Sequence, residues 1–136
     1  MENKLIPRLI SLKKVQDTEG ILVVGEYEKE IPFSIKRVFW IYDVPEGIER
    51  ANHACRNSDS VLICIKGEIK ILLDDGKKEF QYFLNSSDKG VLVPRMVWMK
   101  TSEFSADAIL LVLSSEKYYP EEYCDDYDMF LRETSL

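Results

Sequence analysis

The chain has 136 residues, of which 46% are hydrophobic, 31% charged and 11% aromatic, so we expect a single domain over residues 1–136. Its formal charge of −6, from 18 basic and 24 acidic residues, argues against nucleic acid or an anionic membrane as a partner, although a local basic pocket is compatible with it. The chain has one histidine, so one copy cannot supply a mechanism or a metal site that needs several imidazoles.

The three cysteines, Cys55, Cys64 and Cys124, are an odd number without C-x-x-C spacing, which predicts neither a disulfide framework nor a zinc knuckle. A reducing compartment, the cytoplasm, fits this pattern best. Basic residues interrupt every apolar run near the N-terminus, so we expect neither a secretory signal nor a transmembrane helix of ~20 apolar residues.

Short segments rich in β-branched and aromatic residues recur between turn signals, a pattern typical of strands. In chain order the predicted strands are Ile21–Tyr27, Ile35–Tyr42, Val61–Lys66, Glu68–Leu73, Glu79–Leu84, Val91–Val93, Val97–Thr101 and Ala108–Leu113. Their regular spacing favours an all-β sandwich or barrel.

Two turns stand out within this pattern. Asp75-Gly76 lies between Glu68–Leu73 and Glu79–Leu84 and predicts a hairpin with a type I′ turn. Residues 85–90, Asn-Ser-Ser-Asp-Lys-Gly, predict a loop by their turn-forming content.

The tail has helical features. Pro120 suits a first helical position, and the two glutamates after it favour a helix N-terminus. A helix beginning there places on one face Tyr123, Tyr127, Phe130 and Leu131. We therefore expect a short C-terminal helix docked on the barrel. The four tail tyrosines are interpreted as packing residues: Tyr118, Tyr119, Tyr123 and Tyr127.

The lone histidine, His53, lies just before the strand that runs to Gly67. In an extended segment, alternation places Ala51, His53 and Cys55 on one face, and the small Ala51 leaves room for a pocket. The alternative is that His53 is an ordinary surface or core-edge histidine with a satisfied hydrogen bond.

The spacing from Gly47 to His53, and from Pro94 to Met99, resembles the two cupin motifs, in which a glycine precedes an H-x-H pair and a proline precedes a further histidine. The resemblance implies an all-β, cupin-type (jelly-roll) β-barrel with the short C-terminal helix. Of the four metal-ligand positions of a cupin, only His53 is retained, because the others fall at Cys55, Ser60 and Met99. We therefore expect no metal.

Several segments, in order along nearly the whole chain, resemble the cupin-fold sugar 3,4-ketoisomerases of the WxcM-like family, which act on dTDP-4-keto-6-deoxyglucose. They are Asp17–Gly20, Ile31–Val38, Arg50–Ala54, Leu73–Gly76, Val97-Trp98 and Asp126–Phe130. The Pro-Phe-Ser-Ile-Lys-Arg-Val run and the Tyr-Asp-x-Phe tail are the more specific of these.

The resemblance implies a cytoplasmic homodimer with strand exchange, without metal or cofactor, in deoxysugar biosynthesis for surface polysaccharide such as lipopolysaccharide O-antigen. The reaction moves a ketone from C4 to C3 of a nucleotide-linked hexose through an enediol. It needs a base at C3, protonation at C4 and donors for the developing oxyanion. His53 matches the first histidine of the family's pair, and its ordinary pKa of ~6.5 suits a base.

Four family positions around the pocket are substituted. Cys55 replaces the second histidine of the pair, and Met99 replaces the histidine that follows the tryptophan, here Trp98. Phe39-Trp40 replaces the paired tyrosines after Arg-Val, and Ser60 replaces a glutamine.

These substitutions leave two interpretations of the proton path. In one, the path is rebuilt with Cys55 as an acid, and water completes a shuttle from His53. In the other, Cys55 is a small apolar residue, and His53 serves as base and acid in succession.

Three arginines are candidates for the diphosphate, since a guanidinium fork matches its oxygens. They are Arg37, Arg50 and Arg95, of which Arg50 matches the family's arginine before the histidine pair. The alternative for each is an ion pair with a nearby acid such as Glu46 or Glu49.

The remaining substrate-binding candidates are the substituted family positions around the pocket. Trp40 and Trp98 either stack on the base or fill the barrel, and the wall would be completed by Phe39, Ser60 and Met99.

The leading hypothesis is a metal-free sugar-nucleotide isomerase that binds a dTDP-linked keto-deoxysugar. A second is a catalytically degenerate member that binds a nucleotide sugar or serves as a partner subunit. A third is a nucleotide-sugar 3,5-epimerase, which shares the barrel and the enolisation chemistry but resembles this chain less in Pro32–Val38 and the tail.

Overall fold

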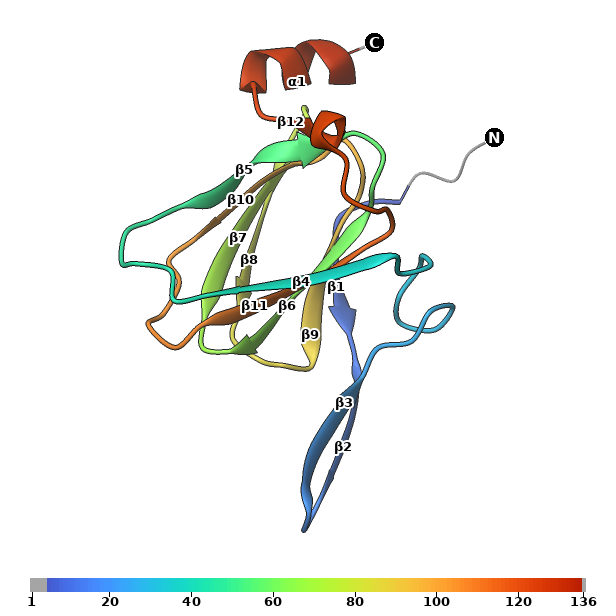
Figure 1. Ribbon diagram of the computed structural model, residues 1–136, viewed down its shortest axis with the longest axis vertical. Helices are drawn as coiled ribbons and strands as arrows, with labels where there is room; N and C mark the ends of the chain where they lie inside the picture. Colours follow the sequence, from blue (N-terminus) through green and yellow to red (C-terminus); the bar gives the residue numbers. More distant parts are fainter. Residues whose placement is uncertain (1–4, 136) are drawn as a thin grey trace.

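The computed structural model describes residues 5–135, which form two facing antiparallel sheets (Figure 1). The first sheet has the order β1 (Arg8–Ser11), β9 (Lys89–Val93), β6 (Ser60–Lys66), β11 (Ile109–Ser114), β4 (Arg37–Tyr42). The second has the order β12 (Tyr123–Cys124), β5 (Arg50–Cys55), β10 (Trp98–Ser102), β7 (Ile69–Asp74), β8 (Glu79–Leu84). The all-β, cupin-type jelly-roll prediction is confirmed.

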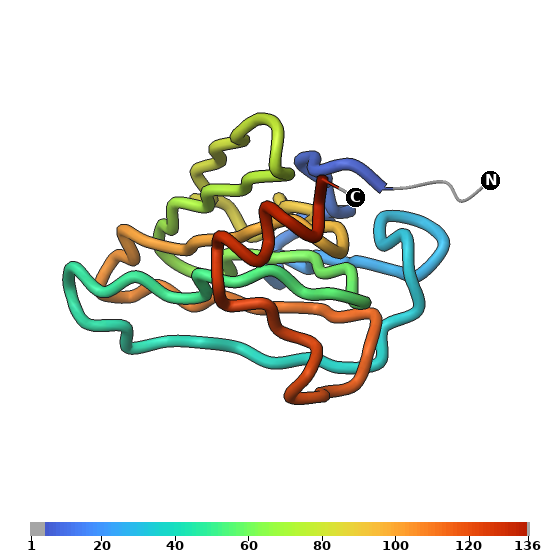
Figure 2. Tube along the Cα trace, turned by 90° about the horizontal axis from the view of Figure 1, so that it is seen from above, coloured from blue at the N-terminus to red at the C-terminus, as the bar shows by residue number. Residues whose placement is uncertain are grey.

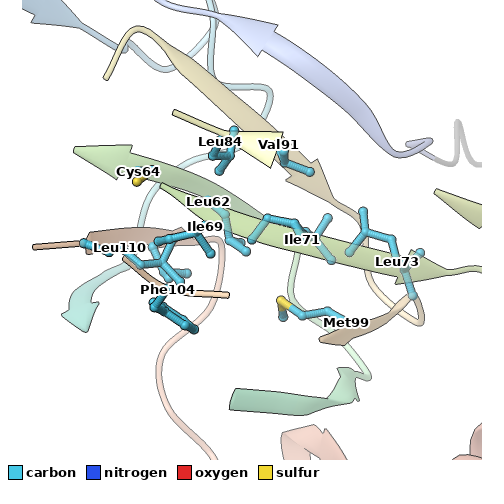
Figure 3. Close-up of a cluster of buried hydrophobic side chains, with 14 residues drawn as sticks. Leu62, Cys64, Ile69, Ile71, Leu73, Leu84, Val91, Met99, Phe104 and Leu110 are labelled. Atoms are coloured by element: carbon cyan, nitrogen blue, oxygen red, sulfur yellow. The ribbon is translucent and has the colours of Figure 1, made fainter. Parts of the chain in front are cut away.

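The main core lies between the two sheets. On β7, alternation buries Ile69, Ile71 and Leu73 and leaves the residues between them half-buried. Figure 3 shows these side chains together with Met99 of the adjacent β10 and Leu62 of β6 in the other sheet. Full burial of each such aliphatic side chain contributes about 1.5–3 kcal/mol to folding.

A second apolar cluster lies on the opposite face of β6 and β11. It joins Val61 and Leu113 to Ile31 and Phe33, which belong to the segment between β3 and β4. Strand β6 is therefore covered on both faces from Val61 to Cys64, which explains the apolar run Val-Leu-Ile-Cys of these residues.

The predicted hairpin is confirmed as β7–β8, but its turn type is wrong. Asp74 pairs with Glu79, which leaves four residues in the turn, and of these only Gly76 has a positive φ, +95°. A type I′ turn needs two. Instead, the Asp75 carboxylate accepts hydrogen bonds from the backbone N–H groups of Lys77 and Lys78, both at 2.9 Å.

Strands β1 and β2 were not expected. β2 (Lys13–Asp17) is exposed at every residue and pairs with β3 (Gly20–Val24) in a ribbon that projects from the body, opposite the C-terminal helix (Figure 1). Its charged sequence lacks the alternation by which strands are recognised.

The C-terminal helix is confirmed, but its predicted start is wrong. Pro120–Glu122 forms one 3₁₀ turn, Tyr123–Cys124 pairs with β5 as β12, and α1 (Tyr127–Thr134) begins only after Asp126. The Asp126 carboxylate caps α1 by accepting from the Met129 N–H at 3.2 Å. The helix is docked by Phe130, which is fully buried with Ala54 and Cys124.

Within residues 5–135, no helix combines the length and apolar character required to cross a bilayer.

Candidate active site

A cavity of about 400 Å³ lies between the inner faces of the two sheets. Figure 2 shows the C-terminal segment crossing over one end of the two sheets. Tyr118, Tyr123 and Asp125 of that segment line the cavity. Two layers from the sheets and one from the tail therefore border the cavity, which is partly open to solvent.

The wall formed by β4 and β11 changes from polar to apolar along the strands. The antiparallel register pairs three sets of lining residues in turn: Arg37 with Ser114, Phe39 with Val112, and Ile41 with Leu110. A charged or hydrogen-bonding group suits the arginine end, and an apolar group suits the other.

His53 enters the cavity from β5 beside a β-bulge. Met99 pairs with His53 and the next residue, Lys100, pairs with Ala51, so Asn52 is the extra residue. Ala51 and Asn52 have φ values of +70° and +56°, an uncommon conformation for residues other than glycine. Such bulges re-aim side chains beside active sites, and here Ala51, His53 and Cys55 all line the cavity.

The His53 imidazole lies edge-on to the ring of Tyr123, with ring centroids 4.8 Å apart. Burial lowers the pKa of His53 below 6.5, partly offset by a hydrogen bond with the Ala51 backbone and by the charge of Asp125. The ring is therefore neutral at pH 7, and a neutral imidazole has one nitrogen free to accept a proton.

The thiol of Cys55 is held in its protonated form. Burial raises the pKa of Cys55 to about 11, against a smaller opposing effect of a hydrogen bond with Ser58. At neutral pH this side chain is thus a neutral member of the cavity wall.

Arg37 is held by aromatic groups. Its Nη1 donates to the Tyr123 hydroxyl at 2.8 Å, and its guanidinium carbon lies 4.5 Å from the centroid of Phe39 and 5.0 Å from that of Tyr118. Among the ion pairs formed by residues 5–135, none involves Arg37. An immobilised cation in a cavity, without a carboxylate partner, is suited to an anionic ligand.

The tail that carries Tyr123 is fastened by Glu122, which is only 4% exposed. Its carboxylate accepts from the backbone N–H groups of Asn57 and Ser58, at 2.9 and 2.6 Å, and from the Ser58 hydroxyl at 2.6 Å. Arg56 adds hydrogen bonds to the carbonyls of Glu121 and Tyr123, both at 3.1 Å. These bonds place the tyrosine ring against the imidazole.

Most of the predicted site residues are brought together. Those that line the cavity are Arg37, Phe39, Arg50, His53, Cys55, Ser60 and Met99.

The other three predicted site residues lie elsewhere. Trp40 is 60% exposed on the outer face, because it alternates with inward-facing neighbours on β4. Trp98 likewise precedes the inward-facing Met99 and packs outside against Tyr127 and Phe130. Arg95 forms an ion pair with Asp59, with 3.5 Å between Nη2 and Oδ2. These three side chains therefore lie outside this cavity.

Sequence reasoning missed several lining residues. Tyr118 and Tyr123, which are interpreted from the sequence as packing residues, also line the cavity, as do Ser58, Thr101 and Asp125. The assumed helical periodicity hid β12, and its pairing with β5 is a long-range contact that no local pattern signals. Among residues 5–135, no three His, Cys, Asp or Glu side chains form a metal-binding group.

The jelly-roll and its internal cavity define a cupin-type protein. Residues 6–135 match the family described as WxcM-like, C-terminal (FdtA), and the chain belongs to this family.

Several proteins that are similar to this chain are named as sugar 3,4-ketoisomerases or 3,4-oxoisomerases. The chain is 39% identical over 130 residues, 96% of it and 91% of the relative, to the TDP-4-oxo-6-deoxy-alpha-D-glucose-3,4-oxoisomerase of Aneurinibacillus thermoaerophilus. It superposes with a TM-score of 0.91, at 36% identity and with 95% and 97% of the two chains covered, on a 3,4-ketoisomerase from Helicobacter canadensis. It also superposes, again with a TM-score of 0.91, on a variant of the 3,4-ketoisomerase from Thermoanaerobacterium thermosaccharolyticum in complex with TDP-4-keto-6-deoxyglucose. The two sequences are 34% identical, and the match covers 95% of this chain and 94% of the other.

Thr101 is a further polar residue in the wall, on β10. It is 2% exposed, and its Oγ1 is buried with no hydrogen-bond partner among residues 5–135. A buried hydroxyl without a partner costs about 1–3 kcal/mol.

Replacing Thr101 with Val should therefore stabilise the ligand-free protein, by about 1 kcal/mol, because the isosteric side chain removes the unpaired hydroxyl. Urea unfolding measures this. Thr101→Ser is the matched control: it keeps the hydroxyl, loses a buried methyl and should lower stability. A less stable Thr101→Val protein would show that the hydroxyl already has a partner.

Proposed function

We propose that this protein is a metal-free 3,4-ketoisomerase that converts dTDP-4-keto-6-deoxyglucose to a dTDP-3-keto-6-deoxyhexose, with His53 as the base. The observation that carries the proposal is the position of the chain's only imidazole, neutral and inside the cavity. The resemblance to proteins named for this reaction supports the substrate class.

In this reaction the base removes the proton at C3, the ketone oxygen at C4 takes up negative charge, and an enediol forms. A neutral imidazole with a lowered pKa is in its base form at physiological pH, as proton abstraction requires. Donors at the cavity wall stabilise the developing oxyanion.

Arg37 and Arg50 are the proposed partners of the diphosphate. The guanidinium of Arg37 is held by the rings of Phe39 and Tyr118. Arg50 lines the cavity, and the alternative of a pair with Glu49 is disfavoured because that carboxylate pairs with Lys100 at 3.1 Å. Guanidinium groups at two places on the wall match a ligand with two phosphates.

The high pKa of Cys55 supports the interpretation in which this thiol is a neutral wall residue rather than an acid. His53 then serves as base at C3 and as acid at C4 in succession.

Incubating the protein with dTDP-4-keto-6-deoxyglucose in heavy water should give deuterium at the exchanging ring position and a 3-keto product, followed by proton NMR. His53→Asn should reduce both by about 100-fold or more, since general base catalysis contributes 10²–10⁴-fold. Cys55→Ser should remain active if the thiol is only part of the wall.

Wild-type protein that shows no exchange at high concentration would contradict the isomerase proposal. If dTDP nevertheless raised its melting temperature, the binding or partner-subunit alternative would take its place.

The dependence of kcat/KM on pH should report the His53 base. Because burial lowers the pKa of His53, the base form persists as pH falls, and kcat/KM should decline only below about pH 6.5. Initial rates between about pH 5 and 8 measure this. An acid limb with an apparent pKa above 6.5 would mean that another group is titrating.

The proposal includes a homodimer with exchanged strands, working in the cytoplasm on deoxysugars for surface polysaccharide such as lipopolysaccharide O-antigen. The ribbon β2–β3 supports the dimer: a two-stranded hairpin is marginal in water, and this one exposes Val15, Ile21 and Leu22. The outer face of the first sheet exposes Trp40 and Tyr42 as a complementary apolar area. The free cysteines support a reducing compartment.

Light scattering on a sizing column should give twice the mass of one chain. Leu22→Glu should shift the protein towards monomer, since a charge cannot be buried in an apolar interface without a large cost. Thr18→Glu, at the tip of the same ribbon, is the control and should leave the dimer intact. A wild-type monomer at micromolar concentration would refute the dimer.

A further inference from the structure

Tyr123 is placed for a chemical role in the cavity. Its backbone is fixed by pairing with Cys55, its ring lies 4.8 Å from the His53 ring, and its hydroxyl oxygen accepts from Arg37 at 2.8 Å. The phenol and the imidazole therefore share one wall.

The hydrogen bond with Arg37 determines what the Tyr123 hydroxyl can do. A guanidinium only donates, so the phenol oxygen is the acceptor and its own hydrogen is left for another partner. Among residues 5–135, no protein acceptor receives that hydrogen. An O–H group of this kind at a cavity wall is available to an oxygen of a bound ligand.

The reaction proposed above needs two proton transfers. One proton moves between carbons, from C3 to C4. A second moves between oxygens, because O3 is a hydroxyl in the substrate and a ketone in the product, whereas O4 changes in the opposite sense. A single imidazole cannot hold both protons at once.

We propose that the transfers are divided between two residues: His53 carries the carbon-bound proton from C3 to C4, and Tyr123 carries the oxygen-bound proton from O3 to O4. This inference rests on the proposed function. As His53 removes the C3 proton, the phenol O–H protonates O4. The phenol oxygen then takes the proton of O3 while the imidazolium of His53 protonates C4. The C3=O bond forms, the C4=O bond has become a C–OH group, and both residues return to their starting states.

Three other wall residues fit the oxygen transfer less well. Met99 has no exchangeable proton. Cys55 has a pKa of about 11, so its thiol gives up a proton less readily than an ordinary cysteine. Tyr118 is 58% exposed and contacts Arg37 through its ring. Of these, only Tyr123 combines contact with His53 and a hydrogen bond from Arg37.

The division has a stereochemical consequence. If one imidazole removes the proton at C3 and delivers it at C4, both events occur on the same face of the sugar. In a gluco-configured ring the hydrogens on C3 and C4 point to opposite faces, so delivery from the C3-hydrogen face leaves the new C4 hydroxyl axial, in the galacto configuration.

Tyr123→Phe tests the proposal, since it keeps the ring against His53 and removes the hydroxyl. With dTDP-4-keto-6-deoxyglucose in heavy water, the variant should form product about 100-fold more slowly or worse. The ratio of deuterium exchange at C3 to product formation should rise at least about tenfold, because the enediolate returns to substrate when O3 cannot pass its proton to O4. Tyr119→Phe, an exposed tail tyrosine outside the cavity, is the matched control.

A higher exchange-to-product ratio in Tyr123→Phe, with an axial C4 hydroxyl in the wild-type product, supports the division. An unchanged ratio, whether rates fall or not, overturns it, because a loss of folding or binding alone lowers exchange and product formation equally. An equatorial C4 hydroxyl also overturns it. Wild-type protein that neither exchanges nor isomerises refutes the proposed function and this inference with it, whereas the other outcomes leave the proposed function standing.

Discussion

The buried carboxylate of Glu122 determines whether this barrel has a complete site. It is fastened by two backbone N–H groups and one hydroxyl from the loop between β5 and β6, and a buried charge is tolerated only with such partners. This loop follows directly on the strand that carries His53. The tail and the imidazole are therefore tied to the same few residues, and the ring of Tyr123 meets His53 as a result.

The aromatic and cationic groups around His53 depend on that attachment. Arg37 is oriented by the hydroxyl of Tyr123 and by two rings, of which Tyr118 belongs to the tail. Burial of His53, which keeps the imidazole neutral, occurs in the cavity that the tail helps to enclose. The tail thus contributes both to the shape of the site and to its electrostatics.

Local periodicity predicted the parts of the fold that depend on alternation. The strands between Val61 and Leu113, the hairpin at Gly76 and the shared face of His53 and Cys55 follow from side chains pointing alternately to the two faces of a strand. The same rule shows that Trp40 and Phe39, being neighbours, cannot both face the cavity. Assigning which of the two faces inward required the packing of the whole sheet.

The features that were missed depend on contacts between distant residues. The exposed strand β2 has no apolar face, so its pairing with β3 is invisible to periodicity. Strand β12 has only two residues and exists because β5 is beside it. No local pattern distinguishes Tyr123, which reaches the cavity, from Tyr119, which does not.

The hydrogen bond between Arg37 and Tyr123 joins residues 86 positions apart. During synthesis the N-terminal part of a domain emerges from the ribosome first, and here the nine strands of the two large sheets other than β12 all precede the tail in the chain. The sheets can therefore assemble while the cavity still lacks its third layer. Tyr118 and Tyr123 reach the site only after the tail too has been released, so completion of the site follows synthesis of the sheet strands.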